Sequence, residues 1–275
     1  MRSICLSLVL FLLLQNFGYS QSPYDLSFKK ELPYYSVGLG SVALGKYLSK
    51  RSPFFTEDEL IPLNASDINA FDRIATSQFS ERHNKASDVL MNGSYAMPFV
   101  LLAGKKTRKS FGQIMLLYGE AVSMNAGFTL ITKFVFKRPR PYIFNETITD
   151  EYKTSRKART SFISGHTSTT TVNCFFAAKI FSDFYPDSKW KPVVWTLAAT
   201  IPAATATLRV TAGKHYPTDV IAGYAMGATI GVLIPHLHRN KKMEDIGLRI
   251  NVGYNSALVT WDFNRTNRQE VKIIY

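Results

Sequence analysis

Three short segments of the chain gather side chains that could bind and process an anion. They cover residues 133–141, 161–167 and 209–219, and between them they hold several basic side chains, two histidines and one aspartate. Histidine can donate or accept a proton near neutral pH, and fixed cations can neutralise a phosphate group. The segments therefore predict acid–base chemistry on an anionic substrate.

The first segment places one cation on a helix and another on a rigid exit from it. Lys133 lies on the last turns of an expected helix, and Pro139 and Pro141 bar that helix from continuing. The two prolines also push Arg138 and Arg140, which precede them, toward extended geometry. Lys133 and Arg140 could thus converge on one dianion. The alternative is a positively charged helix C-terminus that complements the helix dipole.

The second segment has the composition of a helix N-cap followed by a histidine. Ser164, Gly165 and His166 stand immediately before an apolar stretch. Serine caps helices, and the backbone N–H groups at a helix start bind anions. His166 would then stand beside a bound phosphate, where it could give or take a proton. An ordinary cap followed by an exposed histidine is the alternative.

The third segment pairs a histidine with a carboxylate. His215 and Asp219 are four residues apart, and Pro217 suits the first turn of a helix that would bring them together. Asp219 could then hold Nδ1–H and leave Nε2 as a free lone pair. Arg209 could offer its planar fork to phosphate oxygens. The pair could also bind a metal, but no further ligands stand at a useful spacing, so we expect no metal and no cofactor at this site.

Long apolar stretches without period-two alternation predict a mainly α fold, a helical bundle. After Lys242, apolar residues alternate with polar ones on both sides of Asn255-Ser256, which predicts a C-terminal β-hairpin tail. Residues 35–47 could form one more helix packed on the bundle. The expected helices lie at about 86–104, 110–136, 167–184, 191–208 and 218–236.

The chain divides into four expected parts: a signal peptide at 1–21, an N-terminal lead-in at 22–85, a helical domain at 86–242 and a β tail at 243–275. Arg2 and the apolar run from Cys5 to Leu14 are typical of a secretory signal. Cleavage would leave Cys174 alone, and its apolar neighbours favour a packed thiol over a reactive one. Glycines at 223, 227 and 231 form a stripe that lets a neighbouring helix approach closely.

In their order along the chain, the three segments resemble one known family. Lys133-x6-Arg140-Pro, Ser164-Gly165-His166 and Arg209-x5-His215-x3-Asp219 are similar to the motifs of the type-2 phosphatidic acid phosphatase and vanadium haloperoxidase superfamily. Two positions depart from the pattern. Ile163 stands where the family usually has proline, and Leu208 where it usually has serine; the second change could remove a phosphate contact.

The resemblance implies a helical phosphatase domain with a role for each matched residue. His215 would attack phosphorus and form a phosphohistidine, Asp219 would orient it, and His166 would protonate the leaving oxygen and later activate water. The oxygens of the phosphoryl group would be held by Lys133, Arg140, Arg209 and the Ser164-Gly165 backbone. Cations can neutralise that group without a metal.

We therefore expect a metal-independent phosphatase acting on a phosphorylated substrate, a lipid phosphate or pyrophosphate in particular. A soluble periplasmic acid phosphatase, a vanadate-dependent haloperoxidase and a non-catalytic envelope protein are the alternatives. The net charge of +13 favours anionic partners; we expect no nucleic acid among them. The signal places the site outside the cytoplasm, periplasmic or membrane-associated. Composition leaves spanning helices and the buried helices of a soluble bundle equally open. The 142–160 connection could form a lid or a headgroup-contacting rim, and a solvated loop is the favoured alternative.

Overall fold

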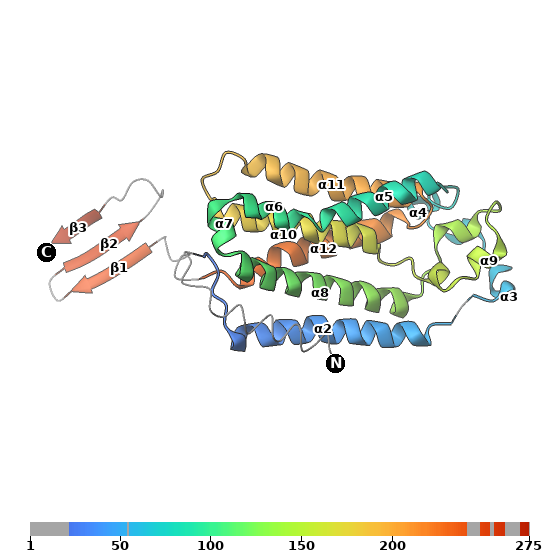
Figure 1. The fold of residues 1–275 in the computed structure, drawn as a ribbon, viewed down its shortest axis with the longest axis horizontal. Helices are drawn as coiled ribbons and strands as arrows, with labels where there is room; N and C mark the ends of the chain where they lie inside the picture. The colour runs from blue at the N-terminus through green and yellow to red at the C-terminus, as the bar shows by residue number, and fades with distance from the viewer. Residues whose placement is uncertain (1–21, 54, 241–247, 254–255, 262–269, 275) are drawn as a thin grey trace.

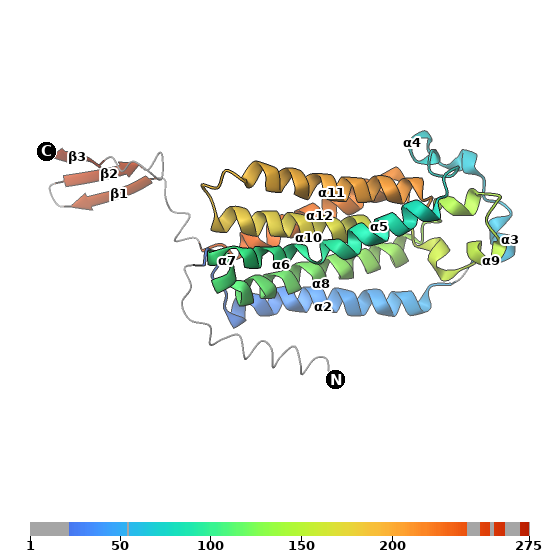
Figure 2. The same cartoon turned by 45° about the horizontal axis from the view of Figure 1, so that its top comes forward.

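The structure is a computed structural model that describes residues 22–53, 55–240, 248–253, 256–261 and 270–274. The predicted signal peptide at 1–21 lies outside the described residues. Five long helices run side by side along the long axis, so the mainly helical class is confirmed (Figures 1 and 2). They are α2 (Phe28–Arg51), α8 (Phe111–Phe136), α10 (Gly165–Phe184), α11 (Lys191–Thr211) and α12 (Pro217–Leu237).

Shorter helices lie along the bundle, as α5 and α6 do, or at its two ends (Figures 1 and 2). The helix expected at 86–104 is wrong as one element, because Pro98 and Gly104 interrupt it and the chain forms several short helices instead. Figure 1 shows α3, α4 and α9 at one end and α7 at the other. The short elements are α3 (Glu57–Leu60), η2 (Ala65–Asp67), α4 (Ala70–Arg73), α5 (Glu81–Ser94), α6 (Met97–Val100), η3 (Leu101–Ala103), α7 (Lys105–Lys109), η4 (Pro141–Phe144), α9 (Asp150–Lys153) and η5 (Arg156–Arg159).

The lead-in supplies helices to the bundle. The helix expected around 35–47 is confirmed as α2, which packs along α8. The predicted boundary at 85 falls inside α5, whose residues contact both α10 and α11. The division of the chain into the four expected parts stays a prediction.

Helix α10 lies at the centre and is contacted by α5, α8, α11 and α12. Its buried face is rich in hydroxyl groups, because Thr170 and Thr171 are fully buried. Each donates a hydrogen bond to the backbone carbonyl four residues earlier, at 2.9 and 2.7 Å. Satisfied in this way, the hydroxyls can be packed without a desolvation penalty. The central helix is therefore polar in sequence and still part of the core.

Helices α10 and α12 approach closely along the glycine stripe of α12. A Cβ atom placed on Gly223 would lie 2.7 Å from the carbonyl oxygen of Ser164, and one on Gly231 would lie 2.9 Å from that of Val172. Gly227 faces the carbonyl of Ser168 even more tightly. The stripe thus fixes the distance between α10, which carries His166, and α12, which begins two residues after His215.

Among the residues that the structure describes, three helices are long and apolar enough to cross a membrane, judged by length and composition: Phe111–Phe144, which extends α8, then Lys191–Thr211 and Pro217–Leu237. In α11 only 22% of the apolar window is buried, and Val193 and Leu197 are about half exposed. Ile221 and Leu233 of α12 are similarly exposed. Apolar faces left uncovered over this length suit contact with lipid, which supports membrane association.

The C-terminal part contains three strands in an antiparallel sheet of order β1-β2-β3. They are β1 (Leu248–Gly253), β2 (Ser256–Trp261) and β3 (Glu270–Ile274), with Ile250 opposite Val259 in the first pair. The sequence predicted only two strands here. Which faces of this tail are packed stays a prediction.

The glycine stripe generates a stability test. We expect Gly227→Ala to lower the thermal midpoint of the detergent-solubilised protein, because overpacking a close helix contact costs about 1–3 kcal/mol. Gly40→Ala is the matched control, since a Cβ there meets nothing within 4 Å in the middle of α2. The thermal midpoint of Gly40→Ala should stay the same or rise, because alanine has a higher helix propensity than glycine. Equal midpoints for the two variants would contradict the close contact.

Candidate active site

The three predicted segments meet at one end of the bundle. They come from the C-terminal ends of α8 and α11 and the N-terminal ends of α10 and α12 (Figure 1). Four other predicted residues lie near enough to His215 for their charges to lower its pKa: Arg140, Lys133, Arg209 and His166. The structure therefore brings the predicted cations and both imidazoles into one cluster.

One backbone carbonyl draws two of the cations together. Lys133 Nζ donates to the carbonyl oxygen of Thr160 at 2.9 Å, and Arg140 Nη2 lies 3.4 Å from the same oxygen. Arg140 has extended backbone, as the following proline predicted, and its N–H donates to Ala158 O at 2.8 Å. Lys137, in the left-handed region at φ 47°, ends α8 and turns the chain toward this segment. The two cations are thus held by backbone geometry before any anion arrives.

The third cation is held by α5. Arg209 Nη1 donates to Asn84 Oδ1 at 2.7 Å and to Ser87 Oγ at 3.1 Å. Arg209 is 3% exposed and its Nε has no hydrogen-bond partner. Sequence reasoning missed these two partners, because they precede Arg209 by more than 120 residues and carry no motif.

His166 faces a carboxylate that the sequence did not predict. Its Nε2 lies 2.6 Å from Asp88 Oδ1 of α5. Burial lowers the pKa of His166 to about 4, the charge of Arg209 acts in the same direction, and Asp88 opposes both. The imidazole is therefore neutral at neutral pH in the substrate-free protein. A bound phosphate anion would favour its protonated form.

A left-handed turn delivers His215 to the cluster. Gly213 has φ 68°, and a Cβ there would meet the carbonyl of Gln78, so this position requires glycine. His215 is 1% exposed. Burial is the largest cause that lowers its pKa well below the usual range, followed by the charges of Arg140, Lys133 and Arg209. A neutral His215 keeps a lone pair available for attack.

Asp219 lies beside His215 but makes its hydrogen bonds elsewhere. His215 Nδ1 is 3.7 Å from Asp219 Oδ2, longer than a hydrogen bond. The same carboxylate accepts bonds from Ser161 Oγ at 2.5 Å and Tyr216 N at 3.0 Å. Arg138 Nη1 donates to its other oxygen at 2.6 Å. The aspartate is thus fixed next to the imidazole by three other groups.

Arg138 and Asp72 form a second layer behind Asp219, and neither stood among the predicted site residues. Arg138 Nη2 donates to Asp72 Oδ2 at 2.7 Å. Asp72 also accepts from Thr218 N and Thr218 Oγ1, at 3.0 and 2.7 Å. The paired prolines around Arg138 signalled its rigid placement, but nothing in the sequence indicated Asp72 as its partner.

Ser164 anchors a loop rather than presenting free donors. Its N–H donates to Asp219 O at 3.1 Å, and its hydroxyl caps α10 by accepting from Thr167 N at 3.4 Å. This differs from the expected use of the Ser164 backbone on phosphate. Gly165 begins α10, where the first N–H groups have no intrahelical partner. A Cβ on Gly165 would approach Lys133 Cε at 3.7 Å, so the helix start faces the cations.

The 142–160 connection forms a rim that is packed in part, so the favoured interpretation as a solvated loop holds only for its exposed residues 146–147, 149–152 and 156–157. Tyr142, Ile143 and Ala158 are buried and form an apolar cluster with Phe55. Lys214 crosses from the α11–α12 turn to donate to the hydroxyl of Tyr152 at 2.7 Å. The rim lines a cavity of about 660 Å³ with basic groups: Arg140, Arg156 and Lys157.

Comparison with known proteins finds a family match over the site segments. A family model described as PAP2 superfamily matches residues 114–243, the part of the chain that holds the three motifs. A solved structure, the first transmembrane PAP2 type phosphatidylglycerolphosphate phosphatase from Bacillus subtilis, is similar at 19% identity and a TM-score of 0.45. The match covers 74% of this chain and 96% of that one. No curated protein matches the sequence.

Proposed function

We propose that the protein hydrolyses phosphate or pyrophosphate esters through a phosphohistidine on His215. One observation carries the proposal: a buried, neutral imidazole lies within the electrostatic reach of Lys133, Arg140 and Arg209. Buried cations without a carboxylate partner of their own attract a dianion strongly. Substrate binding would therefore bring phosphorus to the nucleophile.

Phosphoryl transfer depends mainly on positioning and charge neutralisation. The three cations would hold the non-bridging oxygens, and the first amides of α10 would add donors near Gly165. His215 would attack phosphorus as the bond to the leaving oxygen breaks. Asp219 would stabilise the imidazolium form and is itself positioned by Arg138. No step requires a metal, so we expect activity to survive EDTA in short assays.

His166 would supply the proton that the leaving oxygen needs. Its charge is sensitive to its surroundings, because Asp88 favours the imidazolium while burial and Arg209 oppose it. A bound phosphate offsets the cations and makes the protonated form accessible. After the leaving group departs, the neutral His166 would activate water to hydrolyse the phosphohistidine.

A lipid substrate is supported by the setting of the site. The cluster lies at one end of the bundle, where α8 and α11 terminate and α10 and α12 begin. The helices of this bundle expose apolar side chains. A headgroup could enter the basic cavity at the rim while its acyl chains stay along the helices. We propose that this end faces the periplasm, and the labelling experiment below tests that orientation.

The first test is nucleophile removal. We expect His215→Ala to lose several orders of magnitude of activity on phosphatidate, phosphatidylglycerol phosphate and undecaprenyl pyrophosphate, and Asp219→Asn to lose part of it. We expect the His166→Ala variant to accumulate an acid-labile phosphoenzyme when it is given p-nitrophenyl phosphate. Nitrophenolate leaves without needing a proton, whereas hydrolysis of the phosphohistidine is blocked. His83→Ala, on the exposed face of α5, is the control. Full activity in His215→Ala would end the proposal.

The second test separates general-acid support from structural support. Asp88→Asn should reduce turnover of an alkyl phosphate by part of the roughly 10²–10⁴-fold that a general acid supplies. Turnover of p-nitrophenyl phosphate should fall much less, since nitrophenolate is a good leaving group. Asp67→Asn, at an exposed position, is the control. Equal losses on both substrates would mean that Asp88 acts only on the fold.

The third test concerns sidedness. A membrane-impermeant maleimide should label Glu151→Cys in intact cells, because Glu151 is exposed on the rim at the active-site end. Lys109→Cys, exposed in α7 at the opposite end, should be labelled only after permeabilisation (Figure 2). Cys174 is buried and should add little background. The reverse labelling pattern would place the site on the cytoplasmic side.

A further inference from the structure

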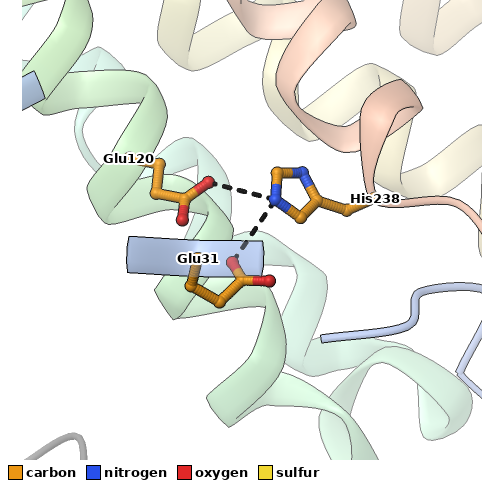
Figure 3. A group of neighbouring side chains, drawn as sticks. All are labelled: Glu31, Glu120 and His238. Carbon is orange, nitrogen blue, oxygen red and sulfur yellow. Dashed lines mark ion pairs between the residues drawn. The ribbon is translucent and has the colours of Figure 1, made fainter. Parts of the chain in front are cut away.

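A second cluster of ionisable groups lies far from the active site. Glu31 comes from the first turn of α2, Glu120 from α8, and His238 follows directly on α12 (Figure 3). All three are buried, with 2%, 0% and 3% exposure. Since His215 precedes α12 and His238 follows it, the 21 residues of that helix separate the clusters by roughly 30 Å. The phosphate chemistry therefore cannot explain this group.

The carboxylates of this cluster lack the hydrogen bonds that buried charges need. Within the part of the chain that the structure describes, no hydrogen bond of good geometry reaches the carboxylate oxygens of Glu31 and Glu120 or His238 Nε2, and their nearest polar neighbours are one another. A buried, unpaired carboxylate is strongly unfavourable. Two of them facing each other require a proton or a bound cation at the point where they meet.

The histidine is oriented as a metal ligand would be. Its Nδ1 lies 2.7 Å from the carbonyl oxygen of Ile234, which can only accept, so Nδ1 carries the proton. Nε2 is then the atom that faces both carboxylates (Figure 3). Metal-binding histidines usually donate their other N–H to a backbone carbonyl or carboxylate in this way. The ring of Tyr34, with its centroid 4.7 Å away, packs against the imidazole.

The spacing fits ligands around a cation better than a hydrogen-bonded triad. Nε2 lies 3.3 Å from Glu31 Oε2 and 3.5 Å from Glu120 Oε2. A charge-assisted hydrogen bond would be about 2.7–2.9 Å. Ligands at 2.0–2.1 Å from a tetrahedral Zn²⁺ are about 3.3 Å apart. All the ligand atoms lie within 4.8 Å of one another.

We propose that Glu31, Glu120 and His238 bind a structural divalent cation of the zinc class, with water as a fourth ligand. Two carboxylates and one neutral imidazole make the loaded site electrically neutral. The ion links the start of α2 and the end of α12 to the middle of the bundle through α8. It stabilises the helix ends opposite the active site and takes no part in catalysis.

The experiment uses the full chain, purified in detergent, stripped with a chelator and reloaded with Zn²⁺ or Co²⁺. Bound metal is measured by mass spectrometry, Co²⁺ geometry by visible d–d absorption, and stability by the thermal midpoint. We expect one ion per chain, tetrahedral Co²⁺ bands and a higher midpoint. Glu31→Gln and Glu120→Gln should weaken binding by at least the roughly 10–100-fold known for supporting residues of metal sites.

Two controls make the result specific. Asp183→Asn removes another buried carboxylate, one already paired with Lys179 and Tyr24, and should keep the metal. His215→Ala should also keep it, so this test is independent of the phosphatase proposal. The inference is overturned if wild type binds no ion, if its midpoint ignores the metal, or if both glutamine variants bind as wild type does. A proton shared by the two carboxylates would give the first two of these outcomes.

Discussion

The active-site end of the molecule is organised by the mutual repulsion of buried cations around one imidazole. Lys133, Arg140 and Arg209 each lower the pKa of His215, so the cluster is unfavourable until an anion enters it. It persists because each cation is tied to a neutral oxygen: the Thr160 carbonyl for two of them and α5 for the third. Neutral acceptors hold the cations in place and leave their charge uncancelled. That arrangement suits the phosphate-binding role proposed for these residues.

Negative charge is placed one layer behind this cluster. Asp219 and Asp72 share Arg138, and the Asp72 carboxylate also accepts from Thr218 at the start of α12. The result is a rigid support that positions the helix start next to His215. Asp88, which lies in α5, likewise contacts and positions His166. His166 and His215 thus each have one carboxylate neighbour. Only the pairing of His215 with Asp219 could be inferred from spacing in the sequence.

The bundle supports this chemistry through two kinds of packing. Helix α10 satisfies its buried hydroxyls internally, and the glycine stripe of α12 lets it lie directly against that helix. Outward faces of α11 and α12 remain apolar and exposed. A highly charged site is therefore carried by a helical bundle whose outer surface suits a lipid environment. This combination fits a phosphatase whose substrate carries both a phosphate and acyl chains.

The sequence by itself determined the helical class, the superfamily motifs and the local geometry of the site segments. These follow from short-range rules: prolines fix the backbone around Arg140, Ser164 caps α10, and Pro217 starts α12. Tertiary structure alone decided the partners. Asp72 and Asn84 come from the polar lead-in and Asp88 lies just beyond it, all without a motif. They reach the site because α4 and α5 pack across the motif helices. The group of Glu31, Glu120 and His238 could not be predicted from the sequence either, because its members lie far apart along the chain. Hydrogen bonds and electrostatic contacts depend on distance in space, which only the tertiary structure sets.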